Sequence, residues 1–177
     1  MIIGLGYKAR SGKDTVAEYL VKNHGYFRRA FADSLKEACK AIFHLSDEQV
    51  YGDLKEVKDE FWGTTPRDIL QRVGTEALRM GYHPDVWVMS LKRFILDSNC
   101  PNWVISDVRF PNEAEAIKEL GGIVVRVDRE KRDDISAGYK HPSEISMDQY
   151  EGWDRVLDNN GHLSQLYENV EVMLGEL

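Results

Sequence analysis

MIIGLGYKARSGKDT, residues Met1–Thr15, contains a complete strand, loop and helix start. Its apolar run predicts a buried strand, which is followed by a short basic loop and then by a helix-patterned segment. Elements in this order form a cradle for anions, because backbone N–H groups converge on the ligand and the helix N-terminus adds positive potential. Lys13 adds a mobile positive charge to the cradle.

The loop is close to the phosphate-loop pattern G-x-x-x-x-G-K-[ST], with two departures. Counting back from Gly12 gives Tyr7 where the pattern has its first glycine, and Asp14 stands where a magnesium-binding hydroxyl is expected. A carboxylate beside phosphates is repulsive unless a cation lies between them, so either Asp14 reaches the metal or Thr15 takes that role. The alternative is a plain glycine-rich turn, in which Asp14 is merely favourable in a first helical turn.

The composition is that of an ordinary globular chain, with 42% hydrophobic and 30% charged residues among 177. The net charge of -7 comes entirely from residue 144 onward, and this acidic end argues against a nucleic acid polymer as partner. Cys39 and Cys100 have no metal-ligand spacing, and Cys39 lies on an apolar helical pattern that predicts a core position. With neither a signal-peptide pattern nor a membrane-length apolar run, we expect a cytoplasmic protein with no membrane partner.

Strand patterns alternate with helical patterns along the chain. This alternation predicts an α/β fold of three layers, a mostly parallel sheet of about five strands with helices on both faces, as one domain over residues 1–177. The apolar pattern around Trp87 predicts a buried helix, and residues 46–65 read as a polar, irregular excursion. For the helix that starts at Pro66, the pattern predicts a buried face at Ile69, Leu70, Val73, Ala77 and Leu78.

Because ligands of parallel sheets bind at the carboxyl ends of the strands, three segments are expected to meet there. The first is the phosphate loop. The second follows the strand that ends at Asp107, an acid suited to holding magnesium or its water shell, with Arg109, Asn112 and Glu113 on the next turn. The third is the end of the following strand, which is rich in basic residues: Arg126, Arg129, Lys131 and Arg132. A mobile lid is predicted there, over about residues 129–145. For the second and third segments, a solvated turn or loop is the alternative.

A fourth group lies on the helix that starts at Pro66. Arg67, Gln71, Thr75 and Arg79 recur every four residues and predict one polar face. Two arginines can grip a monophosphate, and an amide offers both a donor and an acceptor to a base edge. This face is the candidate site for the phosphate acceptor, within a region of about residues 33–95, and a plain solvated helix face is the alternative.

Seven blocks, in order over nearly the whole chain, resemble the phage-type deoxynucleoside monophosphate kinases among the P-loop kinases. They are SGKDT (11–15), FADSLK (31–36), TPRDILQRVGTE (65–76), PDVW (84–87), SDVRFPNEAE (106–115), VVRVDR (124–129) and HPSE (141–144). The resemblance implies transfer of the γ-phosphoryl group of ATP, with Mg²⁺, to a deoxynucleoside monophosphate.

The family pattern also implies roles for matching residues. Lys13, Arg109, Arg129 and Arg132 would be catalytic, and Asp14, Thr15 and Asp107 would lie near the metal. The ATP-binding residues would be Ala9, Arg10, Ser11, Gly12, Lys13, Asp14 and Thr15. The acceptor would meet Asp33, Lys36, Arg67, Gln71, Thr75, Arg79, Arg109, Asn112 and Glu113.

Two rival functions remain open at this point. One is another P-loop small-molecule kinase, acting on dephospho-coenzyme A or phosphomevalonate, and the other is a nucleotide-binding protein without catalysis. The paired arginines of the 67–79 helix speak against the second rival, because a pure switch needs no second phosphate site. The sequence leaves open the base preference and whether the chain forms a homodimer, and the cytoplasm would be that of a host if the source is viral.

Overall fold

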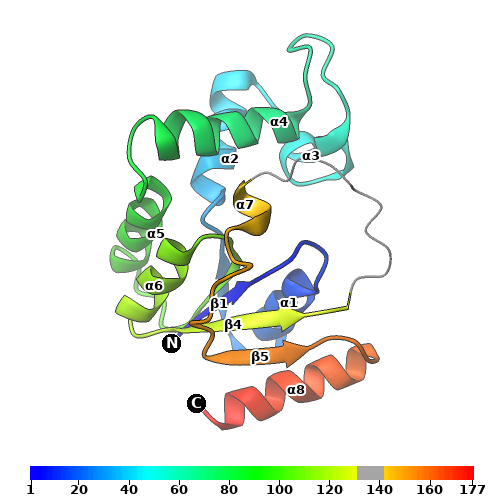
Figure 1. Ribbon diagram of the computed structural model, residues 1–177, viewed down its shortest axis with the longest axis vertical. Coiled ribbons are helices and arrows are strands. Elements are labelled where there is room, and N and C mark those ends of the chain that lie inside the picture. Colours follow the sequence, from blue (N-terminus) through cyan, green and yellow to red (C-terminus); the bar gives the residue numbers. More distant parts are fainter. Residues whose placement is uncertain (131–141) are drawn as a thin grey trace. The chain divides into compact units, whose positions relative to one another are not determined.

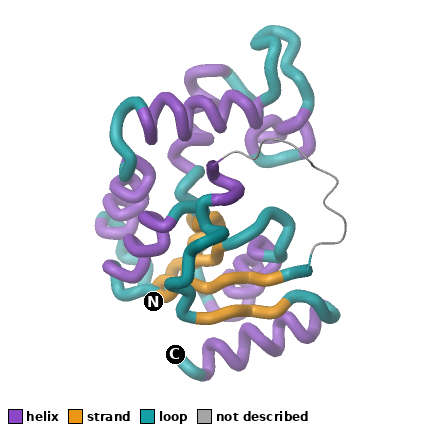
Figure 2. The backbone as a smooth tube through the Cα atoms, viewed as in Figure 1, coloured by secondary structure: helices purple, strands orange, loops and turns teal. Residues whose placement is uncertain are grey.

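The computed structural model describes residues 1–130 and 142–177, with only the backbone of Ser143 and Glu144. It divides into two compact units, one made of Met1–Ala30 with Ser98–Leu177 and the other of Phe31–Asp97. Figure 2 colours their helices, strands and loops. Most of the predicted lid, including Lys131, Arg132 and His141, lies outside the described residues.

The first unit is built on one parallel sheet with the strand order β2-β3-β1-β4-β5. β1 lies at its centre, and Ile3 pairs with Val104 of β3 and with Ile123 of β4. All pairings are parallel, as the alternation of strand and helix patterns predicts, so the fold class is confirmed. The strands are β1 (Ile2–Gly6), β2 (Phe27–Arg29), β3 (Trp103–Val108), β4 (Ile123–Asp128) and β5 (Arg155–Asp158).

Helices cover both faces of this sheet (Figure 1). Because side chains alternate along a strand, Ile3 and Leu5 of β1 join one core cluster, together with residues of α1 (Lys13–His24) and α8 (Leu163–Gly175). Gly4 faces the other way, where a Cβ would collide with Ile117 of α6 (Pro111–Glu119). Glycine therefore lets α6 approach the central strand closely. A short helix, α7 (Pro142–Ile145), precedes β5.

The second unit is helical within the described residues. Its elements are α2 (Asp33–Phe43), α3 (Asp47–Val50), η1 (Asp53–Glu56), α4 (Pro66–Gln71), η2 (Arg72–Met80) and α5 (Val86–Leu96). Trp87 and Cys39 are buried as predicted, and burial raises the pKa of the Cys39 thiol to about 11. The indole N–H of Trp87 donates to the carbonyl oxygen of Gly74 at 2.8 Å, which ties α5 to η2.

Residues 46–65 are mostly exposed and irregular, as the sequence predicts, with two short helical turns among them. Ser46 and Gln49 form a capping box on α3, and the carboxylate of Asp59 accepts from the backbone N–H groups of Phe61 and Trp62. One sequence expectation for this unit is wrong. The helix that starts at Pro66 changes to a π-helix at Arg72, which buries Gly74 and Thr75 and exposes the predicted core residue Ala77. No helix in the described ranges is long and apolar enough to cross a membrane.

Candidate functional site

The loop between β1 and α1 curls tightly around the ammonium group of Lys13. Tyr7, Arg10 and Gly12 all have positive φ angles, of 94°, 60° and 105°, so the backbone reverses repeatedly over a few residues. Lys13 Nζ donates to the carbonyl oxygen of Lys8 and to Ser11 Oγ, the latter at 3.3 Å. Oxygen atoms of the loop thus surround the position where the sequence predicts phosphate binding.

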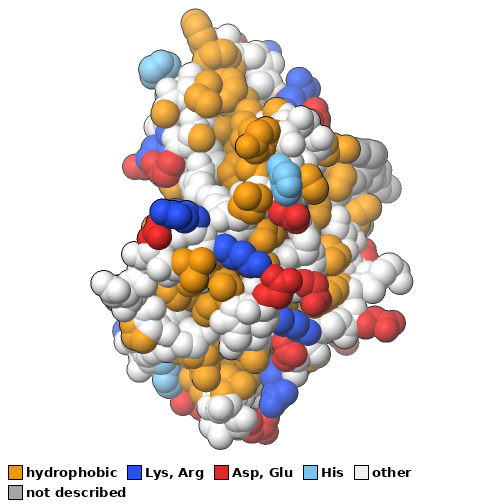
Figure 3. All heavy atoms as spheres, turned by 90° about the vertical axis from the view of Figure 1, so that its left-hand side faces the viewer, with side chains coloured by type: hydrophobic (Ala, Val, Ile, Leu, Met, Phe, Trp, Pro, Cys, Tyr) orange, Lys and Arg blue, Asp and Glu red, His pale blue; other side chains and the backbone are white. Residues whose placement is uncertain are grey.

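Lys13 lies within a group of charged residues at the carboxyl ends of β1 and β3. Burial, together with the nearby guanidinium of Arg109, lowers the pKa of Lys13 to about 8, whereas Asp14 and Asp107 act in the opposite direction. The structure therefore brings together Lys13, Asp14, Asp107 and Arg109, as the sequence predicts. Elsewhere on the surface, on the face that Figure 3 shows, Lys and Arg side chains also lie next to Asp and Glu side chains.

Asp14 has a partner that the sequence analysis did not find. Arg28 of β2 forms an ion pair with the Asp14 carboxylate, and its Nε donates to Ser106 Oγ at 3.1 Å. The arginine offsets the negative charge that a carboxylate brings to a phosphate site. The Asp14 carboxylate is therefore already paired with a guanidinium.

The turn after β3 is held by a buried carboxylate. Glu113 is 2% exposed, and its Oε2 accepts from the backbone N–H groups of Arg109 at 2.8 Å and of Phe110 at 3.2 Å. These bonds cap α6 and hold the backbone of Arg109, whose side chain is exposed. Glu113 thus fixes the backbone position from which the Arg109 side chain extends. Asn112 is half-buried and follows Pro111 in the first turn of α6.

At the exit of β4, a basic residue lies against the phosphate loop. The guanidinium of Arg126 lies 3.8 Å from the centre of the Tyr7 ring and pairs with Asp128 at 2.7 Å. The ring of Trp153 also packs against Tyr7, edge-on, with 6.4 Å between the ring centres. Arg129 is exposed beyond the end of β4, and Arg132 lies outside the described residues.

The other predicted acceptor residues belong to the second unit. Arg67 Nε donates to Glu56 Oε1 at 2.8 Å, Gln71 is half-buried, Thr75 is buried, and Arg79 Nη1 donates to the carbonyl oxygen of Pro84 at 3.2 Å. The π-helix breaks the regular four-residue face, because it turns Thr75 into the core.

Asp33 and Lys36 of α2 lie near a tyrosine that the sequence analysis did not select. Lys36 Nζ is 4.2 Å from the centre of the Tyr51 ring, and the Tyr51 hydroxyl donates to Glu37 Oε1 at 3.1 Å. Burial, the Glu37 hydrogen bond and the nearby Asp33 carboxylate raise the pKa of Tyr51 to about 12. The sequence signal for Tyr51 is weak, because residues 46–65 show neither a helical nor a strand pattern.

The fold and the site define the class of P-loop kinases. Their features are a parallel sheet, a phosphate loop with a lysine between a central strand and a helix, and an acid at the end of the neighbouring strand. Solved structures agree on the fold. A dephospho-CoA kinase from Campylobacter jejuni matches with a TM-score of 0.58 and 18% identity, covering 99% of this chain and 96% of that one. A shikimate kinase from Acinetobacter baumannii matches with a TM-score of 0.55 and 12% identity, covering 99% and 93%.

Sequence relatives give the family. The deoxynucleotide monophosphate kinase family model matches residues 54–170. A putative deoxynucleotide monophosphate kinase from Acanthamoeba polyphaga mimivirus is 41% identical over 96% of this chain and 94% of the relative. The deoxynucleotide monophosphate kinase of Escherichia phage RB69 is 24% identical over 97% and 73%. The chain belongs to the deoxynucleotide monophosphate kinase family, and it is a nucleoside monophosphate kinase that acts on nucleotides.

Proposed function

We propose that the chain transfers the γ-phosphoryl group of ATP to a deoxynucleoside monophosphate in an Mg²⁺-dependent, in-line reaction that gives the diphosphate and ADP. The observation that carries the proposal is the group of Lys13, Asp107 and Arg109 at the mouth of the phosphate loop. Phosphoryl transfer requires positioning and positive charge more than covalent chemistry from the protein.

The donor phosphates would be held by the loop. Residues 9–15 would contribute backbone N–H groups, and Lys13 would exchange its bonds to Lys8 O and Ser11 Oγ for bonds to phosphate oxygens. A lysine that is already within reach of loop oxygens needs only a small displacement to do so. Tyr7 and Arg126 would support the loop from the side of β4.

The residues fit a magnesium ion shared with phosphates. No group of three His, Cys, Asp or Glu side chains in residues 1–130 and 142–177 could hold a metal alone. Mg²⁺ is usually bound by one or two protein oxygens together with substrate phosphates, and Thr15 and Asp107 supply that number. The bound ion would neutralise charge on the phosphates, while Arg28 keeps Asp14 paired.

Each unit, taken by itself, carries residues that the sequence assigns to the acceptor. In the second unit, Arg67 would grip a phosphate, Gln71 would meet the base, and Asp33, Lys36, Thr75 and Arg79 would support them. In the first unit, Arg109 would grip a phosphate, with Asn112 and Glu113 as its support. Arg129 and Arg132 would stabilise the charge that spreads over the phosphoryl oxygens during transfer. A guanidinium in that role can contribute about a thousandfold in rate.

The experiment is a substrate panel. The purified chain with Mg²⁺ and ATP would be offered dAMP, dGMP, dCMP and dTMP, and also dephospho-coenzyme A and phosphomevalonate, with ADP release as the readout. We expect turnover with at least one deoxynucleoside monophosphate and none with the two other acceptors. Turnover confined to the other acceptors, or ATP binding without turnover on any of the six, would contradict the proposal.

A further inference from the structure

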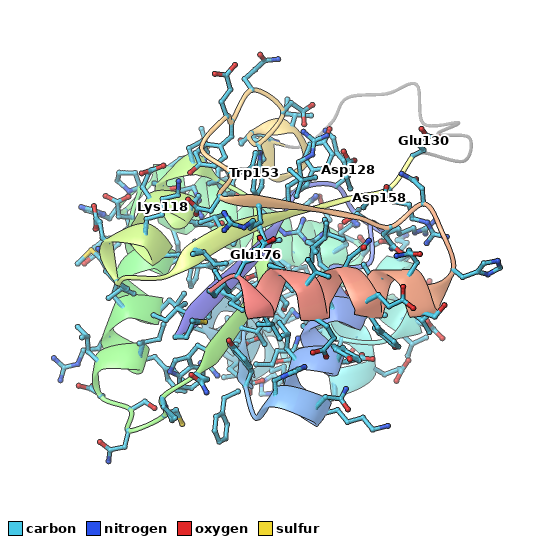
Figure 4. The ribbon with its side chains drawn as sticks, turned by 90° about the horizontal axis from the view of Figure 1, so that it is seen from below. Lys118, Asp128, Glu130, Trp153, Asp158 and Glu176 are labelled. Carbon is cyan, nitrogen blue, oxygen red and sulfur yellow. The ribbon has the colours of Figure 1, made fainter. Side chains whose placement is uncertain are left out.

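The turn between β5 and α8 contacts the phosphate loop through the side chain of Asn159. Asn159 Nδ2 donates to the carbonyl oxygen of Ser11 at 2.7 Å, and the backbone N–H of Asn159 donates to the carbonyl oxygen of Asp128 at 2.8 Å. Asp128 and Asp158 are partners in the parallel pairing of β4 and β5, and Figure 4 labels both at neighbouring strand ends. The turn is thus fixed to the sheet by its backbone, and its amide reaches the loop.

The bond to Ser11 fixes the orientation of one peptide unit. The peptide bond between Ser11 and Gly12 is trans, so its C=O and its N–H point in opposite directions. Since Asn159 holds the carbonyl oxygen, the N–H of Gly12 is directed away from the β5–α8 turn. The carbonyl of Gly12 accepts from the backbone N–H of Val16 at 3.0 Å, which fixes the next peptide unit in the first turn of α1.

The Ser11–Gly12 peptide unit can rotate readily, because a glycine follows it. Gly12 has a φ of 105°, and a glycine passes between backbone conformations with little steric resistance. A rotated peptide would turn the Ser11 carbonyl toward the ligand, where its negative end repels an anion. A loop that binds anions through N–H groups therefore needs a device that prevents the rotation.

The Asn159 side chain also packs closely against Gly12. A Cβ on Gly12 would collide with Asn159 Nδ2, so the amide lies directly against this residue. The donor must be the amide nitrogen, because the Ser11 carbonyl can only accept. An aspartate of the same shape could not form the bond.

We propose that Asn159 is a positioning residue for phosphate binding, which locks the Ser11–Gly12 peptide with its N–H available to the anion. This inference rests on the proposed assignment of residues 9–15 to the donor phosphates. It extends that assignment to a residue of the last strand–helix connection, 148 positions away along the chain.

The experiment compares Asn159→Ala with Asn169→Ala. Asn169 is a matched control, since it is half-buried like Asn159 and its Nδ2 donates to Asp158 O at 3.0 Å, so it supports the same turn without touching the phosphate loop. Calorimetric titration with Mg·ATP and with inorganic tripolyphosphate would measure affinity for a ligand with and without a nucleoside. We expect Asn159→Ala to weaken both probes by roughly tenfold to a hundredfold, and Asn169→Ala to leave both within about twofold of wild type.

Each contrary result has a distinct meaning. Unchanged affinity in Asn159→Ala, equal losses in both variants, or a loss for Mg·ATP with none for tripolyphosphate would overturn the inference, the last because it indicates a contact with the nucleoside. If the wild type binds neither probe, the proposed function fails as well. Asn159→Leu keeps the volume of the side chain and removes only the donor, so it replaces Asn159→Ala if thermal unfolding shows that the alanine variant does not fold.

Discussion

We expect the two units to bind their ligands with different parts of the chain. In the first unit, backbone groups do most of the proposed work, in a short loop with positive φ angles at Tyr7, Arg10 and Gly12. In the second unit, the candidate residues are side chains on helices, such as Arg67 and Arg79, which hydrogen-bond to Glu56 and to the carbonyl oxygen of Pro84. A backbone site depends on glycines and spacing, whereas a side-chain site depends on the exact rotation of each helix.

The largest expected effect comes from removing the charge of Lys13. Lys13→Ala should lower turnover by about a thousandfold or more, because its partly buried ammonium group lies where the donor phosphates are expected to bind. The fold should remain intact, since burial of the charged amine is itself unfavourable. Steady-state kinetics and circular dichroism test this prediction, and near-normal activity would show that the site is elsewhere.

The second unit should affect a different kinetic constant. Arg67→Ala should raise the KM for the deoxynucleoside monophosphate by roughly tenfold to a hundredfold, the loss expected for charged hydrogen bonds, with little change in the KM for ATP. Arg72→Ala is the control, because Arg72 is exposed one turn away and pairs only with Asp68 among the described contacts. If both variants change the KM for ATP equally, the assignment of Arg67 to the monophosphate is wrong.

Two glycines with positive φ offer a matched test of backbone function. Gly12→Ala and Gly63→Ala should each lose about 1–2 kcal/mol of stability, because both glycines have a left-handed backbone conformation, with φ angles of 105° and 67°. Only Gly12→Ala should also weaken ATP binding, by about tenfold, since its methyl group would displace Asn159 from Ser11 whereas Gly63 has open space. Thermal unfolding and ATP titration separate the two effects, and equal ATP affinity in both variants would contradict the prediction.

The smallest effect is a pH dependence that belongs to the first unit alone. With a pKa of about 8 in the free protein, Lys13 is charged below that pH and becomes neutral above it. Phosphates favour the charged form, so ATP binding above pH 8 should take up a proton and weaken by at most about tenfold per pH unit.

Titrations in two buffers with different ionisation enthalpies measure this uptake. In Lys13→Arg the guanidinium stays charged, so the pH dependence of binding should disappear even if affinity falls. If the affinity of the wild type for ATP stayed constant from pH 7 to 9.5, the pKa of Lys13 would not be lowered. The KM for the monophosphate should not follow the same curve.

The sequence predicted the first unit well, for physical reasons. Buried parallel strands are nearly continuous apolar runs, and the spacing of Gly12 and Lys13 after such a run has one main structural solution. Arg28 and Asn159 escaped notice because their contacts join segments far apart in the chain, to Asp14 and to Ser11. No local pattern marks such a residue.

The second unit was predicted less well. The short helix and the turn within residues 46–65 are held by side chain–backbone bonds at Ser46, Gln49 and Asp59, which have no periodicity to detect. The π-helix shifts the buried face to Gly74 and Thr75, and a search based on 3.6 residues per turn cannot foresee that shift. Thr65 and Pro66 were predicted as the start of α4 because their cap is local, and that start is confirmed.

The central position of β1 has a consequence for synthesis on the ribosome. Ile3 emerges early, yet its partners Val104 and Ile123 are translated about 100 residues later. At roughly 5–20 residues per second, the nascent apolar strand waits on the order of 5–20 seconds for the neighbours that shield it. Chaperones that shelter nascent chains should therefore matter more for the yield of this protein than for one whose central strand is made last.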